Sequence, residues 1–391
     1  MNTYFLFGQN AKNKIMKPIR KKIAACILSL LFVLSCVLPA RAQVDWPQDV
    51  EVASEGAILI DADSGAVLYG KNIHEHYFPA SITKILTALI VIEHCDLNET
   101  LTFSYNAVHN VEADSSSAGF DVGDTLTVRD ALYAMLLKSA NEAANALAEH
   151  VSGSIEDFAK LMNEKAQSLG CVDSSFANPS GLNNPNHYTS AYDFSLISKA
   201  AFENPVFVEI DSTKYYTLPP SKNSPEGQTV YTHHAMLKSK TNFYYPNAIG
   251  GKTGYTTLAG NTLVTYARNE KIGLITVVLN GRQTHYPDTT ALLDFGFRCF
   301  SNRPITGSDL NNMDHIMDNI SLIPDINEVT LSLDPKGSLT LPQGEDISQA
   351  SSKISYNLDA SAPQGAIARI SYTYGERQVG ETYILAKHNA P

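Results

Sequence analysis

The sequence predicts an α/β protein of the α+β type, in which an antiparallel sheet carries a cluster of helices and a small all-β domain follows. Three observations lead to this prediction. Strand-like runs lie near 56–69 and 262–279, at the two ends of a region whose middle, 127–202, has helical periodicity. Beyond Cys299 that periodicity gives way to short alternating runs separated by Pro and Gly. We therefore expect a sheet assembled from both ends of the region, with the helices inserted between.

The first 42 residues have the pattern of a secretory signal. A basic stretch precedes the apolar run Ile23–Leu38, and Ala40 and Ala42 are small residues where a signal peptidase cleaves. A retained anchor helix is the alternative, although sixteen apolar residues are short for a membrane span. No amphipathic or apolar tail precedes Pro391. We expect an extracytoplasmic protein, either secreted or associated with the cell envelope through an uncleaved signal segment.

The net charge of the chain excludes some classes of binding partner. Residues 1–42 hold seven of the 29 Lys and Arg and none of the 40 Asp and Glu, so the mature chain has a formal net charge of −18. Such an acidic chain is not expected to bind nucleic acid or to dock on membranes through basic patches.

Cysteine and histidine spacing predicts neither a disulfide framework nor a metal site. Three cysteines, Cys95, Cys171 and Cys299, remain after cleavage, and their odd number and wide spacing favour buried apolar side chains. The clusters His74–His76 and His233–His234 are too tight for helical zinc ligation, and no His-Glu-x-x-His occurs. We expect no metal and no cofactor.

The first expected elements are a hairpin and a buried helix. Gly56–Ile60 and Ala66–Tyr69 are strand-like and flank a turn-rich linker. Pro79 then precedes a helix that opens at Ser81, with apolar residues at i, i+3, i+4, i+7 and i+8 counted from Ile82. Apolar residues on its other side predict burial nearly all round, with the first turn reaching a surface.

A helical block is expected next. Thr127–Asp130 resembles a capping box, and Gly170 is a candidate C-cap. Helices are expected over 131–137, 142–151, 158–169 and 191–202, with an irregular loop at 178–186 and a loop-rich stretch at 203–246.

Strands dominate the remainder. Residues 262–267 and 272–279 are expected to pair as antiparallel neighbours before a closing helix at 289–300. The short runs of the all-β domain are 328–333, 338–341, 354–358, 366–374 and 382–386. The expected division is a signal at 1–42, a larger α+β domain at 43–303 and a β-rich domain at 304–391.

Ser81 and Lys84 are the first candidates for chemistry. Residues at i and i+3 share a helix face, so the lysine can act as a base for the serine hydroxyl, which is a weak nucleophile alone. Burial near another cation would lower the proton affinity of Lys84. Taken alone, Ser-x-x-Lys is equally explained by an N-cap serine in front of a buried helix.

Two further motifs extend the pair. Ser139 and Asn141 lie between two expected helices, where a second hydroxyl can relay a proton and an amide can hold substrate backbone. Lys252, Thr253 and Gly254 open a strand, where a cation and a hydroxyl can bind a carboxylate while glycine lets a peptide lie close. Each has an ordinary explanation: a helix N-cap for Ser139, and a strand lysine with a turn glycine for the second motif.

In this order, the three motifs form the set found in serine β-lactamases and penicillin-binding proteins. The chain resembles the low-molecular-weight D-alanyl-D-alanine carboxypeptidases most fully, over about residues 44–300, and more loosely beyond. The matching segments are Pro79–Lys84, Ser139–Ala144, Asn178–Leu182, Lys252–Thr256 and Leu292–Phe297.

The resemblance implies a β-lactamase-like fold and a serine peptidase that trims the terminal D-alanine from peptidoglycan stem peptides, with β-lactams as acylating inhibitors. Ser81 would be the nucleophile, Lys84 the base, and Ser139 with Asn141 would serve proton transfer and positioning. Lys252 and Thr253 would meet the substrate carboxylate. The backbone N–H groups of Ser81 and Tyr255 would form the oxyanion hole, where one donor is worth roughly 3–4 kcal/mol.

One position departs from the family. Where relatives commonly have an arginine shortly before the closing helix, this chain has His285. Histidine is only partly charged at neutral pH, so carboxylate binding is expected to be weaker or pH-dependent, unless Arg282 substitutes.

Two other functions remain open. A class A β-lactamase would need a glutamate in the loop after the helical block, and residues 172–202 contain none. A non-catalytic envelope protein that binds peptidoglycan is the second alternative, and the intact motif set argues against it.

Overall fold

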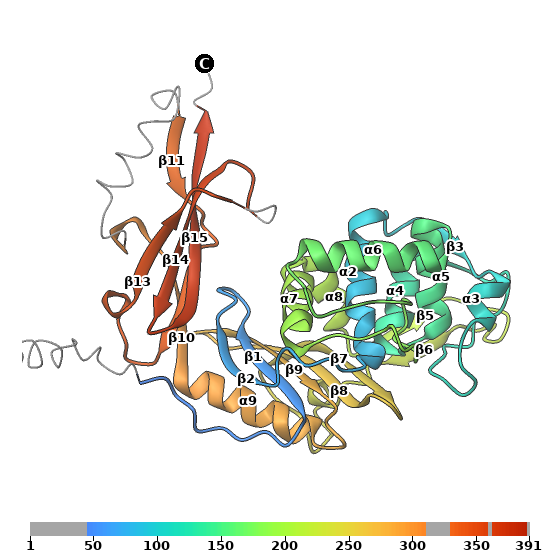
Figure 1. The fold of residues 1–391 in the computed structure, drawn as a ribbon. Helices are drawn as coiled ribbons and strands as arrows, with labels where there is room; N and C mark the ends of the chain where they lie inside the picture. The colour runs from blue at the N-terminus through green and yellow to red at the C-terminus, as the bar shows by residue number, and fades with distance from the viewer. Residues whose placement is uncertain (1–44, 310–328, 359–361, 389–391) are drawn as a thin grey trace, which may run out of the picture. The chain divides into compact units, whose positions relative to one another are not determined.

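The five-stranded sheet is built from both ends of the catalytic region. The structure, a computed structural model, describes residues 45–309, 329–358 and 362–388 (Figure 1), so the predicted signal at 1–42 lies outside the described residues. Within them, β1 and β9 pair antiparallel from Gly56 opposite Leu279 to Asp61 opposite Leu274, so the sheet is assembled from both ends of the region as predicted. The sheet order is β2-β1-β9-β8-β7. Its strands are β1 (Gly56–Asp61), β2 (Val67–Lys71), β7 (Ala248–Thr256), β8 (Gly260–Arg268) and β9 (Gly273–Leu279).

Helices are inserted between β2 and β7, with two small strand pairs among them. The helices are η1 (Ala80–Thr83), α2 (Lys84–His94), α3 (Tyr105–His109), α4 (Val128–Leu137), α5 (Asn141–Ser152), α6 (Ile155–Ser168), α7 (Ala191–Glu203), α8 (Pro205–Asp211) and η2 (Ala235–Leu237). The strand pairs are β3 (Thr100–Thr102) with β4 (Thr125–Thr127), and β5 (Tyr215–Leu218) with β6 (Gln228–Tyr231). The closing helix is α9 (His285–Cys299).

Helices cover both faces of the sheet. Every residue of β9 is buried, which a strand achieves only when both faces are packed. Ile275, Val277 and Leu279 belong to the same core as the apolar residues of α2 and α7. Leu274, which points the other way, contacts Gly296 of α9. The inserted helices therefore pack on one face and α9 on the other.

A second sheet follows α9 directly and confirms the predicted all-β region. Within the described residues it holds six antiparallel strands in the order β10-β12-β15-β14-β13, with β11 also pairing with β15. The strands are β10 (Phe300–Pro304), β11 (Val329–Leu333), β12 (Ser338–Pro342), β13 (Ser351–Ser355), β14 (Ala366–Tyr374) and β15 (Arg377–His388).

The predicted cap at the start of α4 is present in the structure, and two other predicted helix ends differ from the observed ones by a few residues. The capping box at the start of α4 is confirmed, since Thr127 Oγ1 accepts from the Asp130 N–H at 3.1 Å. The first turn at Ser81 is 3₁₀, and the α-helix proper begins at Lys84. Leu169 is the C-cap of α6, and Gly170 follows it in the left-handed region with φ +88°.

Sequence reasoning missed the short helices α3 and η2, the helix α8 and the first turn of α9. The stretch expected to be loop-rich contains α8, which Asn204 caps through its side chain and which has Pro205 in its first turn, a recognised start signal. The closing helix begins at His285, four residues earlier than expected. His285 therefore stands at the first position of α9 and not in the preceding loop.

The cysteine prediction is correct for Cys171 and wrong for the other two. Cys95, Cys171 and Cys299 are all free, but only Cys171 is buried. Cys95 and Cys299 are half-buried because both stand at helix ends, where packing is incomplete.

Candidate active site

Ser81 and Lys84 meet as the helical spacing predicts. Ser81 lies in the 3₁₀ turn η1, and Lys84 is the first residue of α2. The Lys84 Nζ to Ser81 Oγ distance is 3.1 Å. Ala80, just before the serine, has φ +51°, a left-handed conformation that is unfavourable for a residue with a Cβ. The backbone is therefore strained at the residue that aims Ser81.

Lys84 is held in a pocket that suits a neutral amine. Its Nζ lies 2.7 Å from Asn141 Oδ1 and 2.6 Å from the Ser180 carbonyl oxygen, and its side chain is fully buried. Burial and then the positive charge of Lys252 lower the pKa of Lys84 well below its ordinary value, while Glu142 opposes the shift. A neutral amine has two N–H donors and one lone pair. The two carbonyl acceptors take the donors, which leaves the lone pair for the Ser81 hydroxyl.

The loop that carries Ser180 is fitted tightly against Ser81. A Cβ added to Gly181, whose φ is +83°, would lie 1.9 Å from the Ala80 carbonyl oxygen, so only glycine fits there. The Asn178 side chain accepts from the Gly181 N–H at 2.8 Å and fixes the turn. This loop therefore supplies an acceptor to Lys84 and contacts the residue before Ser81.

Ser139 links two helices in a strained conformation. Lys138 ends α4, Asn141 begins α5, and Ser139 between them has φ +62°. Its hydroxyl accepts from Lys252 Nζ at 3.1 Å. The left-handed backbone turns the chain so that Ser139 reaches Lys252 while Asn141 reaches Lys84. The proposed relay residues thus contact both lysines.

Lys252 lies on β7, the edge strand of the sheet, as the motif predicts. It is buried, and burial lowers its pKa to about 8, although the nearby Asp211 carboxylate opposes the shift. Asp211 lies at the end of α8 and accepts from the Gly251 N–H at 2.5 Å. Burial raises the pKa of Asp211 to about 7, and the Gly251 N–H and Lys252 both oppose that rise. The two buried lysines are therefore accompanied by two buried acids, Asp211 and Glu142.

Gly254 lets β7 approach Ser81. A Cβ at this position would stand 2.8 Å from the Ser81 backbone nitrogen and 2.3 Å from Thr262 Oγ1. Thr262 on the neighbouring strand donates to the Pro79 carbonyl oxygen at 2.8 Å. The edge strand and the turn that carries Ser81 are therefore in direct contact.

A cavity of about 590 Å³ opens above these groups. Ser81, Ser139, Asn141, Thr253 and Tyr255 line it, which brings the sequence-predicted residues around one space. Lys84 and Lys252 do not line the cavity, and both are buried beneath it. Further lining comes from Gly254, His285 and Tyr286, from Gly181–Asn183, and from residues 112–116.

His285 reaches the cavity, and Arg282 does not. The His285 Nδ1 atom is buried without a hydrogen-bond partner. Burial lowers the pKa of His285, with Asp288 opposing, so the imidazole is mainly neutral at pH 7. Arg282 is not among the cavity-lining residues, and its guanidinium lies 3.6 Å from Glu55. The proposed substitution of a family arginine by Arg282 is therefore not supported by its position.

Sequence reasoning missed several groups at this site. Asp211, Glu142, the Ser180 carbonyl and His233 belong to no motif that was assigned a role, and 112–116 was part of an unassigned segment. Glu142 follows Asn141 directly, and its Oε1 accepts from the Ala118 N–H at 2.7 Å and the Gly119 N–H at 3.0 Å. Glu142 and Ser180 lay within two segments that match the family, Ser139–Ala144 and Asn178–Leu182, and those matches were the available signals.

Comparison with known proteins agrees with this geometry. The sequence pattern of the peptidase S11 family, described as D-alanyl-D-alanine carboxypeptidase, matches residues 42–283, which include every residue of the three motifs. The chain belongs to this family. As an S11 peptidase it is a serine carboxypeptidase of the penicillin-binding-protein type, as the motif set predicted.

Individual relatives extend the comparison. The S11 chain is 31% identical to the D-alanyl-D-alanine carboxypeptidase DacF of Bacillus subtilis over 73% of each chain. Among solved structures it is similar to the D-alanyl-D-alanine carboxypeptidase of Mycobacterium tuberculosis, with 32% identity, a TM-score of 0.57 and coverage of 66% of this chain and 94% of that one. Penicillin-binding protein 6B of Escherichia coli, at 23% identity, covers 87% of this chain and 97% of its own with a TM-score of 0.64, which shows a shared fold.

Proposed function

We propose that this chain removes the terminal D-alanine from peptidoglycan stem peptides through an acyl-enzyme on Ser81. The observation that carries the proposal is the buried Lys84 amine, placed 3.1 Å from the Ser81 hydroxyl with both of its donors engaged by carbonyl oxygens. Burial and the charge of Lys252 lower the pKa of Lys84, which favours an amine that can accept the serine proton.

The first half of the reaction forms an ester. Ser81 Oγ attacks the carbonyl carbon of the penultimate D-alanine and its proton passes to Lys84 Nζ. The carbonyl oxygen becomes an oxyanion, for which the N–H groups of Ser81 and Tyr255 are the donors in this proposal. The C–N bond then breaks, and the leaving amine takes a proton by way of Ser139. The close approach of β7 to the Ser81 nitrogen supports this arrangement.

The second half hydrolyses the ester. Water attacks the acyl carbon, gives its proton to the Lys84 amine, and Ser81 leaves as a hydroxyl. The released products are free D-alanine and a stem peptide shortened by one residue. Lys252 and Thr253 are proposed to hold the substrate's terminal carboxylate, and Thr253 and His285 both line the cavity. Asn141 positions both Lys84 and the substrate backbone.

Release of D-alanine from a synthetic peptide that ends in D-Ala-D-Ala tests this function. Muropeptide analysis of digested peptidoglycan then separates trimming of stem peptides from cleavage of cross-links. Absence of D-alanine release from the purified protein, together with normal labelling by a fluorescent penicillin, would contradict the carboxypeptidase assignment.

Benzylpenicillin is expected to remain bound as a long-lived adduct on Ser81. A class A β-lactamase hydrolyses this ester with water that a glutamate activates, and 172–202, which includes the loop beside Lys84, contains no glutamate. Intact-protein mass spectrometry should show one penicilloyl group per chain that persists for many minutes. Rapid turnover of benzylpenicillin without an adduct would favour the β-lactamase alternative.

Replacing His285 with arginine is expected to lower KM for a D-Ala-D-Ala peptide by about 10-fold. A permanent cation would bind the terminal carboxylate where a mainly neutral imidazole now stands. In the unchanged protein His285 gains its charge only as pH falls, so KM should decrease toward acidic pH. The arginine variant should lose this dependence. KM of the unchanged protein and of His285→Arg is measured between pH 5 and pH 8. If the substitution changes neither KM nor its pH profile, His285 does not contribute to carboxylate binding.

Localisation outside the cytoplasmic membrane is part of the proposal, because the substrate lies there and because residues 1–42 have the pattern of a secretory signal. None of the described helices is long and apolar enough to cross a membrane.

A further inference from the structure

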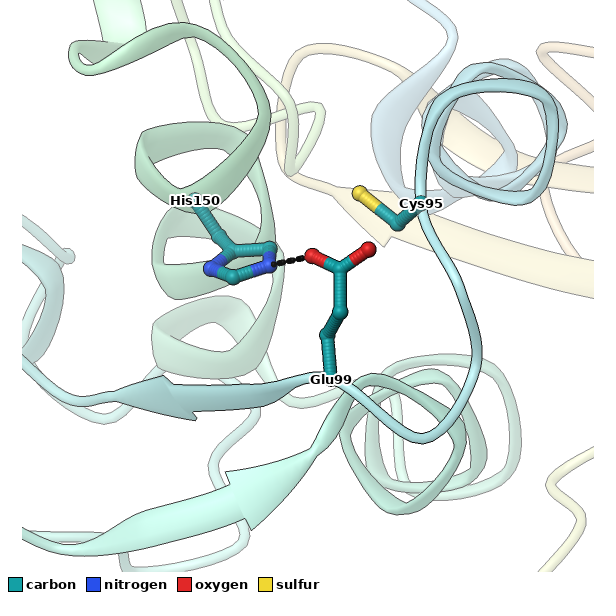
Figure 2. Close-up of side chains that lie close together, drawn as sticks. All are labelled: Cys95, Glu99 and His150. Atoms are coloured by element: carbon teal, nitrogen blue, oxygen red, sulfur yellow. Dashed lines mark hydrogen bonds and ion pairs between the residues drawn. The ribbon is translucent and has the colours of Figure 1, made fainter.

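Three side chains with metal-binding atoms converge beyond the C-terminal end of α2. They are Cys95, Glu99 and His150, and one ligand atom from each lies within 4.8 Å of the others (Figure 2). His150 Nε2 is 2.8 Å from Glu99 Oε2, and the Cys95 thiol lies beside the Glu99 carboxylate. Within the part of the chain that the structure describes, this is the one group of three such side chains.

The three come from separate elements whose backbones are held in place. Cys95 is the C-cap of α2, and its N–H donates to the Val91 carbonyl oxygen at 3.0 Å. Glu99 immediately precedes β3, and its carbonyl oxygen accepts from the Val128 N–H at 2.9 Å. His150 lies in the last turn of α5. The ligand atoms can therefore move by side-chain rotation without any change in the fold.

The donor atoms suit zinc. Thiolate, imidazole and carboxylate are the ligands of Zn²⁺ in proteins, usually at four tetrahedral positions. Bonds of about 2.0–2.3 Å place tetrahedral donors about 3.3–3.7 Å apart. No separation among the three ligand atoms exceeds 4.8 Å, so shifts of roughly 1 Å by rotation of the side chains bring the donors to that spacing.

The site is accessible and balanced in charge. The side chains of His150 and Glu99 are 23% and 46% exposed, so an ion can enter from solvent. A thiolate, a carboxylate and a neutral imidazole carry two negative charges, which match a divalent cation. The three side chains lie away from Lys84, because Lys84 and Cys95 stand at opposite ends of α2, about 16 Å apart.

We propose that Cys95, Glu99 and His150 bind a zinc ion, with water as the fourth ligand, and that the ion ties the end of α2 to β3 and α5. On binding, the Cys95 thiol releases its proton to solvent and a Zn–S bond forms. The His150 Nε2–H···Glu99 hydrogen bond breaks, and the imidazole takes its Nδ1–H tautomer by losing the Nε2 proton to solvent and gaining one at Nδ1. Nε2 and the Glu99 carboxylate then each form one bond to the metal. No electron transfer is involved, and the site is independent of the acylation chemistry at Ser81.

Cobalt is a direct spectroscopic probe for this site. The metal-free chain, prepared by dialysis against a chelator, is titrated with Co²⁺ under reducing conditions. One equivalent should produce a thiolate-to-cobalt charge-transfer band and the strong visible bands of tetrahedral Co²⁺, and one equivalent of Zn²⁺ should remove both. Cys95→Ser should abolish the charge-transfer band, and His150→Ala should weaken binding by at least about 100-fold, because even an outer-shell partner is worth 10–100-fold.

Cys299→Ser is the matched control, since Cys299 is the other half-buried free cysteine and lies in no such cluster. It should keep the full signal. Labelling of Ser81 by a fluorescent penicillin verifies that each variant is folded. Absence of a charge-transfer band in the unchanged chain overturns the proposal, as does a band that Cys299→Ser removes and Cys95→Ser keeps. Zn²⁺ should also raise the Tm of the unchanged chain and not of Cys95→Ser.

Discussion

Ser81→Ala is expected to abolish both covalent labelling by penicillin and release of D-alanine, with a loss of at least about 10⁴-fold in kcat. Without the Ser81 hydroxyl no ester can form at this position. That hydroxyl lies 3.1 Å from Lys84 Nζ, in a turn whose preceding residue, Ala80, has a strained backbone. Alanine in place of a half-buried serine leaves no large cavity, so the variant should fold. Fluorescent-penicillin labelling and D-alanine release measure the two losses.

An exposed serine supplies the control. Ser168→Ala, at the end of α6, should keep full labelling and full D-alanine release. Labelling that survives in Ser81→Ala with the same stoichiometry would show that another residue is acylated, and the assignment of Ser81 would then be wrong.

Lys84→Met is expected to slow acylation of Ser81 by about 10²–10⁴-fold, the usual contribution of a general base. Methionine has a similar length and suits a buried position, so the packing around α2 should survive. Asn141 Oδ1 and the Ser180 carbonyl lose a donor, at a cost of about 1–3 kcal/mol for each unsatisfied group. The second-order rate constant of acylation by a fluorescent penicillin, measured by stopped flow, reports the effect separately from the stability loss.

Lys160→Met is the comparison variant, because Lys160 lies on α6 with a side chain that is 73% exposed. Its acylation rate should match that of the unchanged chain. If Lys84→Met retains an acylation rate within about threefold of normal while remaining folded, Lys84 is not the base, and Ser139 or Lys252 becomes the candidate.

Short-range features of this chain are predictable because they depend on neighbours in the sequence. The contact between Ser81 and Lys84 follows from helical spacing, and the Thr127 cap follows from its capping box. The start of α9 was expected at residue 289, four residues too late; its first turn contains Pro287, and proline is well tolerated there. The assembly of the sheet from both ends of the helical block was also predicted, whereas the specific pairing of β1 with β9 was given only by the structure.

Long-range features required the fold. The motif set identified Ser139 and Lys252, but their 3.1 Å hydrogen bond depends on a left-handed turn between α4 and α5. No spacing rule joins Asp211 to Gly251 across 40 residues. The pKa of Lys84 falls because packing of several elements excludes water from it, and exclusion of water is a property of the assembled core.

The sequence by itself therefore sets the catalytic residue types, their order along the chain and the contact between Ser81 and Lys84. Helix periodicity is enough for that contact, because it brings residues three apart onto one face. The lowered pKa values of Lys84 and His285 and the convergence of Cys95, Glu99 and His150 are set by tertiary structure. Each of these depends on groups from distant segments brought together, and on how much water their packing leaves around them.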